Sequence, residues 1–154
     1  MPDRPTHQGI DIQRTVPRPA WGEYGAIMGE PVFAMHSGTV LRAAWGGSNP
    51  GFWVIIRSDV IDPASNTYLV SRFIHLRDYQ VARNQIISQG THVGHVGNTG
   101  HTIGSGPGRR SSGHLHIDVN NNNLEVGDVY GNSINPQRFF PQINFEGALS
   151  TIVP

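Results

Sequence analysis

Short runs of β-branched and aromatic residues, bounded by glycine, proline or asparagine, constrain the fold of this chain more than any other feature. Residues 52–57 and 67–76 are clear examples. Such runs favour β-strands, and no apolar period of 3.6 residues continues far enough to indicate a major helix. The 19 glycines and 11 prolines indicate many turns. We therefore predict an all-β fold, mainly an antiparallel sheet with long loops and little helix.

Turn residues divide the chain into the expected strands. Ser37-Gly38 lies between two apolar runs and predicts a β-hairpin. Residues 78–87 fit either a short helix or an extended connector. The expected strands are 31–35, 39–45, 52–57, 67–76, the glycine-spaced region 90–100, and 113–119.

Length and charge limit the possible classes of protein. The 154 residues predict a single domain over 1–154, with core motifs in 7–119 and a tail, 120–154, packing on it. Net charge is zero and no basic stripe is present, so nucleic acid is not an expected partner. No apolar stretch approaches the roughly 20 residues needed to span a bilayer, and residues 1–15 show no secretory signal. We expect a monomer.

Two residue types that carry chemistry are missing. No cysteine is present, which excludes disulfides, thiolate nucleophiles and cysteine-ligated zinc. All 11 basic side chains are arginine, so no lysine can form a Schiff base or carry lipoyl or biotinyl groups. The glycine-spaced hairpins therefore do not belong to a carrier domain of that kind.

A pair of histidines, His114 and His116, is the main chemical signal. Successive side chains of a strand point to opposite faces, so these two share one face. Near the other end of the chain, His7 and Asp11 would also share a face in an extended segment. Two histidines and one aspartate suit Zn²⁺ with one open coordination position, which is the catalytic arrangement.

Several motifs in this order resemble the lysostaphin-type zinc endopeptidases of bacterial cell walls, the LytM family. The resemblance runs from about residue 7 to residue 119. Its carriers are residues 7–12, 29–34 with 38–40, 73–76, the glycine-spaced 94–100, and 113–116.

The resemblance implies a role for each matching residue. His7, Asp11 and His116 would be the ligands of one zinc ion, and His75 and His114 the two catalytic histidines. It also implies an antiparallel sheet with the site in a groove walled by loops. The expected substrate is a peptide bond of peptidoglycan, in a cross-bridge or stem peptide, which places the protein outside the cytoplasm.

Zinc and histidine side chains can together hydrolyse a peptide bond. Zinc lowers the pKa of a bound water to about 7. A neutral imidazole can take the water proton, and a ring N–H can stabilise an oxyanion and protonate a leaving amine. His75 and His114 could supply these functions in either order. Asp118 shares the face of His116 and is either a hydrogen-bond acceptor for the site or lies beyond it.

The sequence departs from the family pattern at few points. Phe73 stands two residues before His75, where relatives commonly carry an aromatic hydroxyl. Loops 13–28 and 103–112 are long, and we expect them to wall the cleft and bear on specificity. We interpret His36, His92, His95 and His101 as ordinary surface or loop histidines outside the site.

Two other functions compete with a zinc endopeptidase. The spacing of His114, His116 and Asp118 is similar to the metallo-β-lactamase signature, but Val119 replaces the histidine that follows there. Some LytM-like domains have lost ligands and act as binding or activator modules for other wall hydrolases. Intact His7 and Asp11, with the histidines named above, favour the enzyme.

Overall fold

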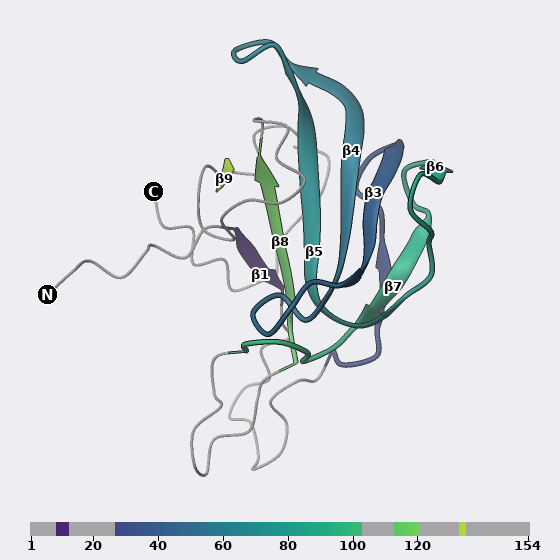
Figure 1. The fold of residues 1–154 in the computed structure, drawn as a ribbon, viewed down its shortest axis with the longest axis vertical. Coiled ribbons are helices and arrows are strands. Elements are labelled where there is room, and N and C mark those ends of the chain that lie inside the picture. Colours follow the sequence, from purple (N-terminus) through teal and green to yellow (C-terminus); the bar gives the residue numbers. More distant parts are fainter. Residues whose placement is uncertain (1–8, 13–26, 103–112, 121–132, 135–154) are drawn as a thin grey trace, which may run out of the picture.

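The computed structural model describes residues 9–12, 27–102, 113–120 and 133–134. Within these residues all regular structure is β-strand, as Figure 1 shows. No helix there is long and apolar enough to cross a membrane. The strands are β1 (Ile10–Ile12), β2 (Pro31–Phe33), β3 (Gly38–Trp45), β4 (Phe52–Asp62), β5 (Thr67–Tyr79), β6 (Ile86–Ile87), β7 (His92–Val96), β8 (Leu115–Asn120) and β9 (Ser133–Ile134).

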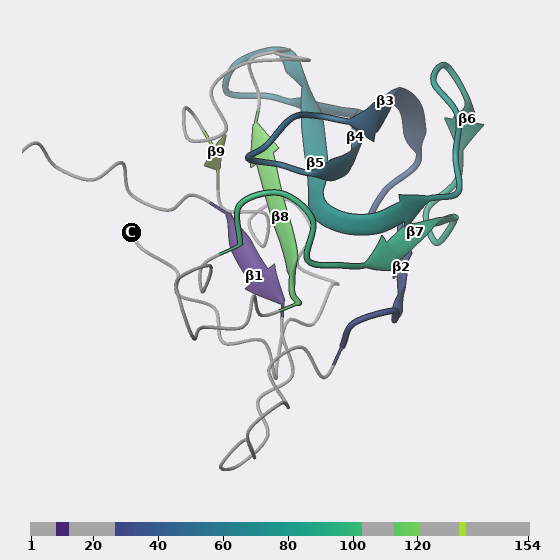
Figure 2. The ribbon, with the colours of Figure 1, turned by 60° about the horizontal axis from the view of Figure 1, so that its bottom comes forward.

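The strands form an antiparallel sheet in the order β1-β8-β5-β4-β3-β6. The long strand β5 lies at its centre and pairs with β4 and β8, and its last residues pair with β7. Strand β7 in turn pairs with β2, and β9 pairs with β8. Figure 2 shows β2 beside β7, away from β1 and β8. The predicted all-β, antiparallel fold is confirmed.

The main hydrophobic core lies on one face of this sheet. It is built from alternate residues of the long strands together with side chains of β2 and β7. In β8, Leu115, Ile117 and Val119 belong to this core, so the alternation of a strand sends His116 and Asp118 to the opposite face. That opposite face has a smaller buried cluster, formed by Trp53, Ile55 and Val70. Strand β8 is therefore buried on both faces, and its polar face holds His116 and Asp118.

The structure contradicts the predicted hairpin and decides between the two alternatives for residues 78–87. Residues 31–35 and 39–45 do not form a hairpin, because β2 pairs with β7 whereas β3 pairs with β4 and β6. Gly38 is the first residue of β3 and not part of a tight turn. Of the two alternatives for residues 78–87, the structure shows the extended connector: β5 continues to Tyr79, and β6 follows after a short turn.

The prediction that His36 is a surface or loop histidine is wrong, because only 5% of it is exposed. Its Nδ1–H donates to the carbonyl of Ser37 at 3.0 Å, which leaves Nε2 to accept from the Ser71 hydroxyl at 2.8 Å. A neutral ring satisfies both contacts. Burial lowers the pKa of His36, while the Ser37 contact and the charge of Asp59 oppose that decrease.

The pKa of His36 predicts how stability depends on pH. Because the folded pKa lies below the unfolded value of about 6.5, the unfolded chain binds this proton first as pH falls. His36 therefore reduces the free energy of unfolding below about pH 6.5, by at most about 1.4 kcal/mol per pH unit. Urea unfolding of metal-free protein at several pH values between 7.5 and 5 gives the free energy of unfolding at each pH. This free energy should fall less steeply with decreasing pH in His36→Gln than in the unsubstituted chain. Equal slopes would contradict the prediction.

Candidate functional site

The pairing of β1 with β8 brings Asp11 and His116 together. The two residues are direct partners in the antiparallel register, and Ile74 of β5 is the partner of His116 on its other side. Partners in such a register lie on the same face of the sheet. Residues more than a hundred positions apart in the sequence thus meet because a three-residue strand is added to the edge of β8.

One carboxylate oxygen of Asp11 faces both histidines of the pair. Its Oδ1 lies 2.7 Å from Nδ1 of His116 and 3.6 Å from Nε2 of His114. Both rings are buried, whereas Asp11 is partly exposed. Three of the predicted site residues therefore converge on one place, and the carboxylate forms its side toward solvent.

Gly9 explains why this segment lies so close to β8. Its φ of 118° is a conformation that side chains rarely adopt. A Cβ there would lie 2.6 Å from Nε2 of His116 and 2.7 Å from the carbonyl oxygen of Ile117. Only a glycine allows the backbone before Asp11 to lie against the imidazole ring.

His75 joins this group from the central strand. Its ring centroid lies 4.9 Å from that of His114 and 6.2 Å from that of His116. Its φ of 63° is in the left-handed region, which is uncommon for a residue other than glycine. Such strain persists only where surrounding contacts fix it, and it concentrates at functional sites. The conformation breaks the regular alternation of β5 at the point where His75 reaches the other two rings.

Two neighbouring loops hold His75 in this conformation. Its backbone N–H donates to the carbonyl of Pro50 at 2.9 Å, and its Nδ1–H donates to the carbonyl of Thr99 at 2.8 Å. The Thr99 hydroxyl donates to the carbonyl of Leu76 at 2.6 Å and accepts from the N–H of Phe52 at 2.9 Å. Thr99 thus joins β4, β5 and the loop after β7 around one histidine.

The two central histidines have pKa values that move in opposite directions. Burial, assisted by the neighbouring rings of His114 and His116, outweighs the Thr99 contact and the charge of Asp11 and lowers the pKa of His75 to about 4. Burial alone would also lower the pKa of His116. The hydrogen bond to Asp11 and the negative charges of Asp11 and Asp118 outweigh burial and raise that pKa to about 9. Without a metal, His75 is therefore neutral at pH 7 and His116 is positively charged.

Asp118 lies within the site and not beyond it. It is fully buried, and its Oδ2 is 3.7 Å from Nε2 of His116. Its other oxygen, Oδ1, accepts from Nε of Arg72 at 2.6 Å. Arg72 is not among the residues that the sequence predicts for the site. Its position three residues before a candidate catalytic histidine, as the only charged residue of 67–74, is the signal that the sequence offers.

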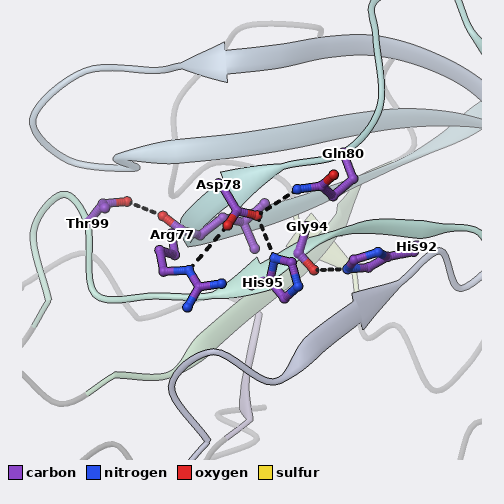
Figure 3. Close-up of polar contacts among 8 residues, drawn as sticks. Arg77, Asp78, Gln80, His92, Gly94, His95 and Thr99 are labelled. Carbon is purple, nitrogen blue, oxygen red and sulfur yellow. Dashed lines mark hydrogen bonds and ion pairs between the residues drawn. The ribbon is translucent and has the colours of Figure 1, made fainter.

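A second group of polar side chains lies at the junction of β5 and β7, as Figure 3 shows. Nδ1 of His95 contacts Oδ1 of Asp78 at 2.7 Å, and the rings of His95 and His92 are 4.7 Å apart. Arg77 and Gln80 also donate to Asp78. These contacts lower the pKa of Asp78 against the opposing effect of burial. His95 and His92 are half-buried and paired in this way, while His101 is exposed, as expected for a loop histidine.

The side-chain donors at Asp11 and His116 fit part of the zinc site that the family resemblance implies. An aspartate oxygen and a histidine nitrogen that converge within 2.7 Å are the donor types of a zinc site. Among the described residues, however, no group of three or more such side chains is arranged to hold a metal ion. The third predicted ligand, His7, lies outside the described residues, as do loop 103–112 and most of loop 13–28.

The family model of peptidase family M23 matches residues 5–136. The chain belongs to peptidase family M23. The match covers every candidate site residue, His7 included. No curated protein matches the chain.

Solved structures of M23 peptidases share the fold. The catalytic domain of the antimicrobial peptidase lysostaphin from Staphylococcus simulans is 20% identical, with a TM-score of 0.63 over 88% of this chain and 79% of that one. Full lysostaphin is 21% identical with a TM-score of 0.62, and the match covers 95% of this chain but only 55% of lysostaphin. The catalytic domain of a mutant of EnpA, a prophage-encoded M23 protein from Enterococcus faecalis, is 21% identical with a TM-score of 0.54, over 85% of this chain and 76% of that one.

Removing the Thr99 hydroxyl should loosen His75. In Thr99→Val the carbonyl of Leu76 and the N–H of Phe52 lose their partner, which should lower the free energy of unfolding by about 1–3 kcal/mol. Nitrogen-15 NMR should then show a His75 ring that is no longer fixed in the Nδ1–H tautomer. Thr99→Ser keeps the hydroxyl and should behave like the unsubstituted chain. A single fixed tautomer in Thr99→Val would contradict this role.

Proposed function

We propose that this protein is a zinc-dependent endopeptidase that hydrolyses peptide bonds in the cross-bridges or stem peptides of bacterial peptidoglycan. Membership of peptidase family M23 and the fold shared with lysostaphin support this proposal. The observation that carries it is the convergence of Asp11 with His116, His114 and His75 at one place on the sheet. Because peptidoglycan lies outside the cytoplasm, we expect the protein to act there.

His7, Asp11 and His116 would hold one zinc ion, with Nδ1 of His116 as the ligand atom because it faces Asp11. Three protein ligands leave one coordination position open. When bound, zinc would lower the pKa of a coordinated water to about 7 and polarise the scissile carbonyl.

The tautomer of His75 suits it to accept a proton. A carbonyl only accepts hydrogen bonds, so the proton of the neutral ring is on Nδ1, toward Thr99, and Nε2 has the lone pair. The low pKa keeps this lone pair available at neutral pH. A proton that His75 takes from the attacking water is therefore also released readily, to the leaving amine.

We assign to His114 an action on the scissile carbonyl of the substrate. Its ring lies between His75 and Asp11, 4.9 Å from the His75 ring and with Nε2 3.6 Å from the Asp11 oxygen. A ring N–H in this place can donate to the oxygen of the scissile carbonyl as negative charge develops on it. This division assigns proton transfer to His75 and oxyanion stabilisation to His114.

The proposed roles predict different results for two substitutions. His116→Ala should abolish stoichiometric zinc binding and wall lysis, because it removes a ligand. His75→Asn, which tolerates the left-handed backbone, should retain zinc and lower kcat by about 10²- to 10⁴-fold. His101→Ala removes an exposed histidine and should change neither quantity. Metal analysis and turbidity assays on purified proteins measure both. Zinc retained by His116→Ala would disprove its role as a ligand.

Digestion of defined peptidoglycans identifies the bond. Sacculi with polyglycine bridges and sacculi with direct cross-links are incubated with the full chain, with and without a chelator. Mass spectrometry then locates new amino termini, which should appear only without chelator. If zinc-loaded protein releases no new amine from either, the endopeptidase proposal is wrong, and a catalytically silent binding or activator module is the better description.

A further inference from the structure

Arg72 and Asp118 form an ion pair in the interior of the sheet. They are partners in the register of β5 and β8, and Nε of Arg72 lies 2.6 Å from Oδ1 of Asp118. Their side chains are only 2% and 0% exposed. Ile55 of β4, fully buried, is the register partner of Arg72 on its other side.

A pair in this position is not explained by stability. Removing two charges from water costs several kcal/mol for each ion, and well-packed apolar residues of similar volume are often as stabilising or more so. The same face of the sheet holds such residues at Trp53, Ile55 and Val70. The neighbourhood of the pair therefore indicates what it does.

The polar side chain next to this ion pair is that of His116. Asp118 follows it by two residues in β8 and so lies on the same face. While Oδ1 of Asp118 contacts Arg72, Oδ2 lies 3.7 Å from Nε2 of His116, a distance for electrostatic attraction and longer than a hydrogen bond. The opposite edge of the ring, Nδ1, is 2.7 Å from Asp11. A continuous row thus runs from Arg72 through Asp118 and His116 to Asp11.

A carboxylate beside one ring nitrogen of histidine favours the proton on that nitrogen and leaves the lone pair on the other. We propose that Arg72 is a positioning residue of the metal site: it holds Asp118 against the Nε2 edge of His116, so that Nδ1 is presented to the metal. This inference rests on the proposed function, because it takes His116 to be a zinc ligand. Arg72 acts through Asp118 and touches neither metal nor substrate.

Zinc affinity of the full chain, measured by competition with a chromophoric chelator, tests this role directly. Arg72→Met keeps the length of the side chain and removes its charge, and should weaken zinc binding by about 10- to 100-fold. Asp118→Asn should weaken it comparably. Val54→Ala is the matched control, since it removes buried methyl groups from the opposite face of β4. It should lower stability and leave zinc affinity unchanged.

The double variant Arg72→Met with Asp118→Asn separates action through Asp118 from a general effect of charge. If Arg72 acts through Asp118, the two losses of zinc affinity should not add. The double variant should then bind zinc as tightly as whichever single variant has the lower zinc affinity. Arg72→Lys restores a charge without the planar guanidinium and should recover part of the affinity. Additive losses would overturn the proposed order of action.

The outcomes distinguish this inference from the proposed function. If the unsubstituted chain binds no zinc, the proposed function fails. If it binds zinc and Arg72→Met binds equally well, the inference about Arg72 fails alone. Should Arg72→Met not fold, Asp118→Asn decides in the same assay, with unchanged affinity overturning the inference and weakened affinity supporting it.

Discussion

The antiparallel pairing of β1 with β8 is the constraint on which the rest of the site depends. It sets Asp11 directly opposite His116, and a shift of one residue would turn Asp11 to the other face of the sheet. Only three residues of β1 make this pairing, so the close approach of Gly9 to the His116 ring is part of what fixes it. The site is therefore assembled by sheet register across most of the sequence, and not by a local motif.

Strand β8 can carry the site because it is buried on both faces. Leu115, Ile117 and Val119 pack into the main core and fix the strand, while His116 and Asp118 alternate with them. Rigid strands hold side chains more accurately than loops, which suits a site in which several side chains must converge. His75 is the exception, since its left-handed backbone depends on contacts from Pro50 and Thr99.

Much of this arrangement could be predicted from sequence. Alternation in residues 114–118 placed His114, His116 and Asp118 on one face, and the motif order indicated the family that the match over residues 5–136 then showed. Strand pairing could not be predicted from local sequence. Ser37-Gly38 has the residue types of a hairpin turn, yet β2 pairs with β7, because packing of the whole core determines which strands pair.

The burial of His36 and Arg72 could not be predicted from sequence. Histidine and arginine are mostly exposed in proteins, so sequence patterns give no reason to bury His36 or to pair Arg72 with a residue 46 positions away. The burial of both residues is explained only by their neighbours in the folded sheet. The Ser71 hydroxyl donates a hydrogen bond to His36, and Asp118 compensates the charge of Arg72. The ring of His116 then links that buried pair to Asp11.

An anomalous-difference map from crystals grown with zinc tests the central claim most directly. The account predicts one strong zinc peak within bonding distance of Asp11 and of Nδ1 of His116, with Asp118 on the far side of that ring. A peak on His92 and His95 beside Asp78 instead, or no peak at Asp11 in zinc-saturated crystals, would contradict it.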